Sequence, residues 1–260
     1  MTVEKLATRY DMGLEHDRRY DTALADFCAQ LVQPAMRASA LRELMRREIP
    51  ADQPDIVSVL FIEAAARLLG QKWSTDDCNF VDVTIGATRI QEIIRLLSFE
   101  FRNRRSRAWA PFVVITTPAG EQHTLAQHIL GLLLDTMGWS SQILNGKDVQ
   151  GAGLRSALKR ADMICIGWSN HRLKTEFKDI VTMARSAAPG PPIPIVVGGA
   201  AALNSVDFLV SLGIDCICDS VYSASRILEK FHELEAIGQQ VEASGRRATG
   251  NDGRPDWLIR

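Results

Sequence analysis

The residues from Pro111 to Leu130, PFVVITTPAGEQHTLAQHIL, constrain the fold most, because an apolar run gives way to a polar turn and then to a helix. Phe112 to Ile115 are aromatic and branched residues in a short unbroken run, which is typical of a strand buried on both faces. The residues that follow place leucine and isoleucine at helical spacing. His123 therefore lies where a strand is joined to a helix, and open α/β sheets bind their ligands at that edge.

The same alternation of strand and helix continues along the second half of the chain. Strands are predicted near 112–116, 140–143, 162–166, 194–197 and 214–217. Helices are predicted near 122–137, 151–160, 172–187, 203–212 and 222–237. This pattern predicts an α/β fold with a flavodoxin-like (Rossmann-like), doubly wound parallel sheet of five strands, in the order 2-1-3-4-5.

The N-terminal half contains helical patterns without strands. Apolar residues recur at helical spacing in four segments, several of them bounded by proline or glycine, near 17–31, 35–47, 54–70 and 76–101. Three or four packed helices, an all-α bundle over 17–101, are therefore expected, after a flexible N-terminus at 1–16.

The remaining segments are polar. Residues 102–110 form a basic linker that contains RNRRSR, which either stays solvated or contacts a phosphate backbone or an acidic partner. The sheet domain is expected over 111–237, and a polar tail rich in Gly and Arg over 238–260 is predicted to be disordered.

Composition narrows the function classes. The chain has 260 residues, a net charge of -1 and a pI of about 6.5, so bulk charge does not indicate a nucleic-acid binder. No apolar run is long enough to span a bilayer, and the first residues are too polar for a signal peptide, so we expect a cytoplasmic protein with no membrane contact. The five cysteines lack the C-x-x-C spacing of a zinc site.

Three loops should meet at the carboxyl edge of the predicted sheet. Each has an ordinary structural explanation: a surface histidine, a serine that caps a helix, or glycines in a turn. Their convergence on one edge is what indicates a ligand site. The candidate residues in these loops are Gly120, Glu121, His123, Ser169, His171, Gly198 and Gly199.

Several common ligands are disfavoured at this edge. The chain has no G-x-G-x-x-G after the first strand and no P-loop motif, which argues against a dinucleotide or a nucleoside triphosphate. The third strand ends in Gly167, Trp168 and Ser169 and not in an aspartate, unlike a phosphoacceptor receiver domain. The T-T-P-A-G loop has too few hydroxyls to bind a flavin phosphate. A ligand that meets an imidazole, a hydroxyl and bare backbone remains.

The spacing of these elements resembles that of the cobalamin-binding domain family. Its signature is D-x-H-x-x-G, then about 41 or 42 residues, then S-x-L, then about 26 to 28 residues, then G-G. Here E-Q-H-T-L-A at 121–126 and S-N-H at 169–171 are separated by 42 residues, and 26 more precede the glycine pair at 198–199. The resemblance covers roughly residues 110–237.

The resemblance implies a role for each residue. His123 would be the lower axial ligand to cobalt, in place of the cofactor's own dimethylbenzimidazole, and Glu121 would orient its ring. Ser169, Gly198 and Gly199 would line the channel for the displaced nucleotide tail.

This sequence departs from the family pattern at three positions. Glu121 replaces the aspartate and lengthens the arm, Ala126 replaces a glycine, and His171 replaces a leucine, which would put a second imidazole near the pocket. Heme, another tetrapyrrole that takes an axial imidazole, is the alternative cofactor, with His123 or His171 as its ligand.

The helical half bears on the state of the cofactor. Photoreceptors that use adenosylcobalamin cap its upper face with a tryptophan that is followed, after nine residues, by Glu-His. Trp73 is a candidate cap or a core residue, but Val83 and Thr84 stand where that pair would be. Hydroxocobalamin is therefore expected over intact adenosylcobalamin.

Together these features are similar to the AerR/PpaA antirepressors of photosynthetic bacteria. The resemblance implies a light- and redox-responsive regulator that is not an enzyme and binds a CrtJ/PpsR-type repressor of photosystem genes. Light would photolyse adenosylcobalamin, and the hydroxocobalamin formed would load onto His123. Contact with DNA, through the complex or the basic linker, is left open, and the alternatives are a corrinoid carrier of a methyltransferase and a heme-based redox sensor.

Overall fold

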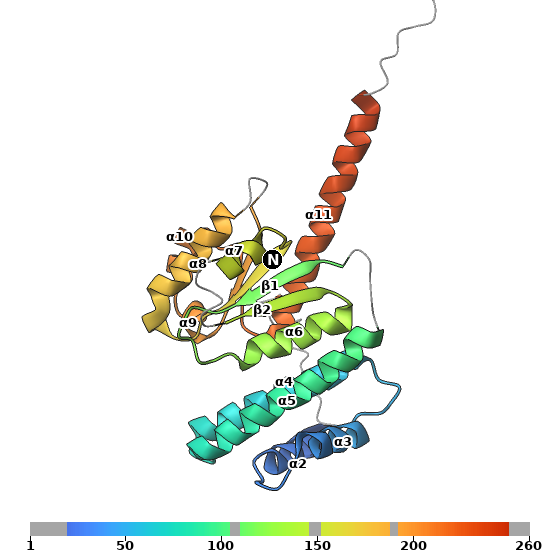
Figure 1. The fold of residues 1–260 in the computed structure, drawn as a ribbon, viewed down its shortest axis with the longest axis vertical. Helices are drawn as coiled ribbons and strands as arrows, with labels where there is room; N and C mark the ends of the chain where they lie inside the picture. The colour runs from blue at the N-terminus through green and yellow to red at the C-terminus, as the bar shows by residue number, and fades with distance from the viewer. Residues whose placement is uncertain (1–19, 105–109, 146–151, 188–191, 250–260) are drawn as a thin grey trace, which may run out of the picture.

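The computed structural model describes residues 20–104, 110–145, 152–187 and 192–249. These residues form an all-helical part followed by a parallel sheet flanked by helices (Figure 1). The predicted flexible N-terminus at 1–16 and most of the basic linker lie outside the described residues. No helix within the described ranges is long and apolar enough to cross a bilayer.

The helical part contains four helices, and side-chain hydrogen bonds set where the fourth one begins. Before the last of them, Asp76 has a positive φ of 60° and Asn79 caps the helix, accepting hydrogen bonds from the N–H groups of Val81 and Asp82. This helix therefore begins four residues later than the periodicity predicts. The four helices are α2 (Asp21–Leu31), α3 (Ala38–Glu48), α4 (Asp55–Ser74) and α5 (Phe80–Arg104).

The bundle and the sheet part share a hydrophobic core. Ile129, Leu132 and Leu133 of helix α6 (Leu125–Met137) pack into the same cluster as the buried faces of α2 to α5. Asp135, also on α6, accepts hydrogen bonds from Ser98 Oγ at 2.6 Å and from Arg102 Nε at 3.0 Å, both on α5. The two parts are therefore joined by apolar packing and by one buried carboxylate.

The sheet has the predicted composition and order. Its strands are all parallel and are arranged β2-β1-β3-β4-β5, as the sequence predicts. The register aligns Gly167 at the end of β3 with Gly198 at the end of β4, so the loops after these strands leave the sheet side by side. The strands are β1 (Phe112–Thr116), β2 (Ser140–Leu144), β3 (Met163–Gly167), β4 (Ile195–Gly198) and β5 (Cys216–Cys218).

Helices cover both faces of the sheet (Figure 1). On one face, α6 and α11 (Val221–Thr249) pack against residues such as Ile115 and Cys165. The other face carries α7 (Ala152–Leu158), the short η4 (His171–Leu173), α8 (Lys174–Ser186), α9 (Ala200–Leu203) and α10 (Val206–Ser211).

The structure differs from the sequence prediction in three segments. The helix expected at 203–212 begins at Val206, as α10, and the short helix α9 before it was not predicted. Asn204 and Ser205 separate the two helices, and Asn204 Nδ2 donates to the carbonyl of Ala200. Helix α11 continues to Thr249, although a disordered tail was expected from residue 238. Residues 239–249 contain two Gln, two Ala and two Arg, which favour helices, and one Gly. Helix α5 extends to Arg104, into the predicted linker.

Candidate functional site

A buried carboxylate organises the loops at the carboxyl edge of the sheet. The side chain of Glu121 is 1% exposed. Its Oε1 accepts hydrogen bonds from the N–H groups of Gln122 and His123, and its Oε2 accepts them from Ser169 and Asn170 at 2.9 Å each. One carboxylate therefore joins the loop after β1 to the loop after β3, two segments far apart in the sequence.

The same carboxylate contacts the ring of His123, with 2.7 Å between Oε1 and Nδ1. Burial alone would raise the pKa of Glu121, but hydrogen bonds from the His123 ring and from backbone N–H groups outweigh it and hold that pKa below its ordinary value. Glu121 is therefore ionised at neutral pH. The longer arm of glutamate places its carboxylate on the histidine, as the resemblance implied for an aspartate.

This contact decides which nitrogen of His123 is free. An ionised carboxylate only accepts hydrogen bonds, so Nδ1 is the donor of the pair. Neutral imidazole has a single N–H, and Nε2 therefore keeps its lone pair. The side chain of His123 is 73% exposed, so this nitrogen is available to an incoming metal.

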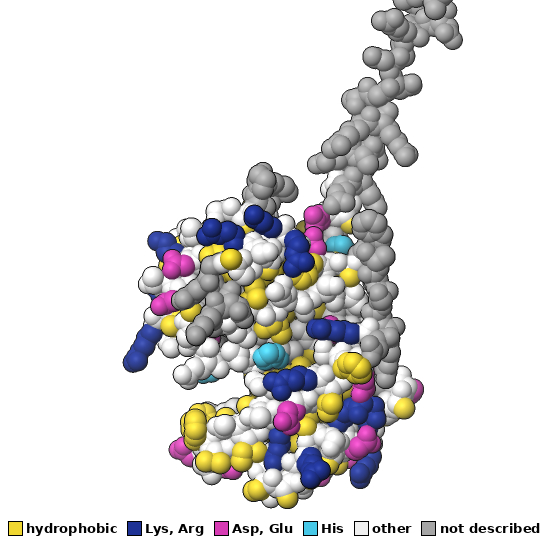
Figure 2. Space-filling model, in the orientation of Figure 1, with side chains coloured by type: hydrophobic (Ala, Val, Ile, Leu, Met, Phe, Trp, Pro, Cys, Tyr) yellow, Lys and Arg dark blue, Asp and Glu magenta, His cyan; other side chains and the backbone are white. Residues whose placement is uncertain are grey.

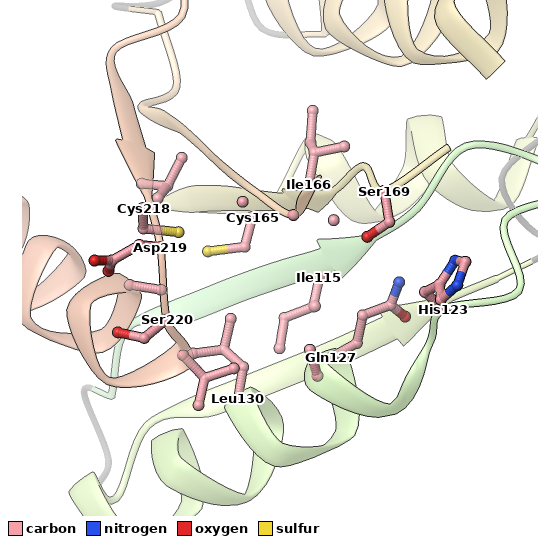
Figure 3. Close-up of a pocket in the computed structure, with 17 residues that line it drawn as sticks. Ile115, His123, Gln127, Leu130, Cys165, Ile166, Ser169, Cys218, Asp219 and Ser220 are labelled. Atoms are coloured by element: carbon pink, nitrogen blue, oxygen red, sulfur yellow. The ribbon is translucent and has the colours of Figure 1, made fainter. Parts of the chain in front are cut away.

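His123 lies at one end of a pocket of about 170 Å³ between the sheet and the helices α6 and α11 (Figure 3). The walls are mostly apolar and include Ile115, Leu130 and Val196. Asp219 and Ser220, from the turn before α11, lie at the other end (Figure 3). The pocket can take a flat, largely apolar group that extends inward from a ligand held at His123.

The glycine pair after β4 keeps the third loop close to the second. At Gly199, φ is +111°, and a Cβ would lie 2.5 Å from the carbonyl oxygen of Trp168 and 2.8 Å from Ser169 Oγ. At Gly198, a Cβ would lie 2.8 Å from Cys218 Sγ. Both glycines and Ser169 also line the pocket. Small residues are therefore needed at these positions for two reasons: they let the two loops pack closely, and they leave the pocket open.

The other predicted site residues lie around this centre. Gly120 has a φ of +91° in the turn that precedes Glu121, and Ala126 is exposed at the pocket wall, where its methyl group fits. The structure does not bring His171 into the pocket: its exposed ring lies edge-on to Trp168 at 5.7 Å, and its Nδ1 is 3.5 Å from Ser205 Oγ.

Trp73 lies in the bundle, at the end where α4 stops and α5 starts. The residue is 46% exposed, and its ring packs edge-on against the ring of Phe80. Phe80 and its apolar neighbour Val81 are also exposed, at 71% and 60%. Helix α6 begins on this same side of the molecule (Figure 1), and Figure 2 shows an open notch here between the bundle and the sheet part, with apolar side chains gathered below it.

Gln127 lines the pocket one helical turn after His123 and was not among the predicted site residues. The residue is 4% exposed, and neither its Oε1 nor its Nε2 has a hydrogen-bond partner among the described residues. The available signal was a polar residue four positions after His123 on the apolar face of a helix.

The sequence comparisons found two relatives. No known family model matches the chain. A Rhodobacter capsulatus protein described as an uncharacterized 20.5 kDa protein in the bchF-crtJ intergenic region is 26% identical over 182 residues, which are 69% of this chain and 92% of that protein. The HTH-type transcriptional repressor CarA of Myxococcus xanthus is 29% identical over 139 residues, 53% of this chain and 43% of CarA.

The structural comparison supports the fold assignment. The monomethylamine corrinoid protein of Methanosarcina barkeri superposes with a TM-score of 0.61 at 13% identity, over 82% of this chain and 97% of that one. The chain therefore has the fold of a corrinoid protein, which confirms the predicted resemblance to cobalamin-binding proteins and the flavodoxin-like sheet with a helical N-terminal part. The heme alternative gains no support from these comparisons.

Proposed function

We propose that this protein binds cobalamin through His123 and acts as a non-enzymatic regulator by binding a CrtJ/PpsR-type repressor of photosystem genes. One observation carries the cofactor assignment: Oε1 of the buried Glu121 carboxylate lies 2.7 Å from Nδ1 of the exposed His123 ring, at the mouth of a pocket.

The residues present fit this cofactor. An imidazole held by a carboxylate is a suitable axial ligand, because the carboxylate raises its basicity and fixes its orientation. The pocket beside it is apolar enough for a heterocyclic base, and it contains a buried amide that lacks a partner within the described chain. His123 would hold the cobalt, and Ser169, Gly198 and Gly199 would line the space for the nucleotide tail. Bound cobalamin would supply a cobalt whose upper ligand responds to light and redox state.

The bundle supports the same placement. Trp73 and Phe80 present exposed apolar surface where α4 ends and α5 begins, on the side of the molecule where α6 starts (Figure 1), and such a surface would suit a hydrophobic cover for a corrin ring held at His123. Hydroxocobalamin is the proposed form, because Val83 and Thr84 stand where the Glu-His pair of adenosylcobalamin photoreceptors would be.

The regulatory role rests on the relatives. One is encoded between bchF and crtJ, and crtJ gives its name to the repressor that the sequence resemblance implies as partner. The other is itself a transcriptional repressor. Cofactor loading can regulate only if the loaded protein binds the repressor more tightly than the empty protein does.

Gel filtration of the protein mixed with a purified CrtJ/PpsR-type repressor tests this role. We expect co-elution after loading with hydroxocobalamin, and little co-elution of the cofactor-free protein or of a His123→Ala variant. Co-elution that does not depend on the cofactor would contradict the coupling. A loaded protein that never binds the repressor would refute the partner and leave cobalamin binding intact.

A corrinoid carrier of a methyltransferase is the second candidate, because the superposed structure over 82% of this chain is a corrinoid protein. A carrier loaded with methylcobalamin would transfer its methyl group to a thiol acceptor in the presence of a cognate methyltransferase. Such turnover would favour the carrier over the regulator.

A further inference from the structure

We propose that Gln127 is the residue that selects the nucleotide tail, by a hydrogen bond between its side-chain amide and the heterocyclic base that enters the pocket. This inference rests on the proposed cobalamin function and assigns the pocket a specificity residue. It applies to the base and not to the corrin ring.

The position of Gln127 points its amide into the pocket. The residue lies on α6 one turn after His123, and Figure 3 shows its side chain between His123 and the sheet, with Ser169 opposite. A Cβ at Gly167, the last residue of β3, would lie 3.7 Å from Gln127 Nε2. The amide therefore lies over the carboxyl end of the central strands, on the path from His123 to the interior.

The hydrogen bonding of this amide is incomplete within the described chain. Both Oε1 and Nε2 are buried and lack a partner there. Buried polar side chains in folded proteins are nearly always hydrogen-bonded, and an amide can donate twice and accept twice. The partner must therefore come from outside the chain, as a ligand or as solvent.

The surroundings indicate which kind of ligand supplies it. The described residues that line the pocket include no lysine or arginine, and the charged group at the far end is the carboxylate of Asp219. A phosphate inside the pocket would meet no cation and would face a like charge, so the group that enters is the base of the tail and not its phosphate. The apolar walls of Ile115, Leu130 and Val196 instead fit a neutral, flat heterocycle, whose ring nitrogen is an acceptor for Nε2.

A packing role alone does not explain glutamine at this position. Leucine or methionine would fill a similar volume without burying an amide, so a purely structural site would favour either. The cofactor-free protein is expected to be less stable with glutamine than with leucine, which makes the proposal measurable without any ligand.

The test compares hydroxocobalamin with cobinamide, which has the same corrin ring without the nucleotide tail. Titration followed by absorption should show that Gln127→Leu weakens cobalamin binding roughly tenfold, the loss of one hydrogen bond, and leaves cobinamide binding unchanged. The melting temperature of the cofactor-free variant should rise by roughly 2–4 °C. Gln53→Leu, at an exposed amide in the turn before α4, is the control and should change neither affinity.

Three other outcomes overturn the inference. An equal loss for cobalamin and cobinamide would mean that Gln127 acts on the corrin ring or on the fold. Unchanged cobalamin affinity in both Gln127→Leu and Gln127→Met would mean that solvent satisfies the amide. Failure of the wild-type protein to bind either corrinoid would refute the cobalamin assignment itself, and this inference with it.

Discussion

At the scale of single residues, Glu121 has the largest structural role in the site. Its two oxygens accept from four backbone N–H groups and from the His123 ring, and these donors come from two loops. Glu121, which orients the candidate metal ligand His123, therefore also holds together the loops after β1 and β3. Loss of its charge should affect stability and cofactor binding together.

We predict that Glu121→Gln lowers the free energy of unfolding by about 1–3 kcal/mol, because an amide NH2 would replace one acceptor and face N–H donors. The variant should also bind cobalamin more weakly, since an amide donating to Nδ1 of His123 would move the ring proton to Nε2. Urea denaturation and cofactor titration measure the two effects. Gln122→Glu, an exposed change on the same turn, is the control, and equal stability of wild type and Glu121→Gln would contradict this role.

Gly199 has a backbone conformation and a clearance that other residues cannot match. We predict that Gly199→Ala destabilises the protein by about 2–4 kcal/mol, because a Cβ would overlap the carbonyl of Trp168 at a positive φ. Gly70→Ala, in open space on the exposed side of α4, should instead stabilise by up to about 1 kcal/mol. Thermal unfolding of the two variants measures both changes. Melting temperatures that shift in the same direction for both variants would contradict the prediction.

Site residues that belong to a motif of recognisable residue types and spacing could be predicted from the sequence. Site residues whose role depends on how their side chains pack in the folded protein could not. His123, Ser169, Gly198 and Gly199 were found from their intervals, and the structure brings them to one edge. His171 shares the loop with Ser169, but its ring turns toward Trp168, which no spacing could reveal. Gln127 was missed because its amide becomes informative only once its burial without a partner is known.

At the scale of secondary structure, α5 and α6 form the joint between the bundle and the sheet part. Asp135 is buried on α6 and accepts from Ser98 and Arg102 on α5. This contact joins the last turns of α5 and α6, at the opposite end of α6 from His123.

We predict that Asp135→Asn lowers the free energy of unfolding by about 1–3 kcal/mol, because the hydrogen bonds from Ser98 and Arg102 lose their charged, buried acceptor while the shape is kept. Chemical denaturation measures this change. Asp179→Asn, at an exposed position on α8, is the control and should change stability little. An unchanged unfolding midpoint for Asp135→Asn would show that apolar packing alone holds the joint.

The pattern of elements was predictable, and their ends were less so. Every strand of the sheet follows from the alternation of apolar runs and helical patterns, and the observed order is that of the flavodoxin-like fold that this alternation suggested. Helix α6 begins at Leu125 and not at 122, because the Glu121 carboxylate accepts the N–H groups of the turn. The break between α9 and α10 depends on the side-chain hydrogen bond of Asn204, a competition that periodicity does not register.

At the scale of the whole molecule, the arrangement of the two parts was the least predictable feature. Helical periodicity showed that the N-terminal segments have apolar faces, but it could not show that these faces share a core with α6. That shared core places the end of α4 and the start of α5, which carry Trp73 and Phe80, on the side of the molecule where α6 begins (Figure 1). The proposed cofactor at His123 would lie on this side, and contact with the bundle would couple its state to the relative position of the two parts.

The most direct test of the central claim is an absorption spectrum after incubation with hydroxocobalamin and desalting, for wild type and for His123→Ala. We expect corrin bands that stay with the wild type, shifted from those of the free cofactor, and that are lost from the variant. The exposed His123 side chain contributes little packing, so the variant should keep its fold by circular dichroism. Equal retention of corrin by both proteins would contradict the assignment of His123 as the cobalt ligand.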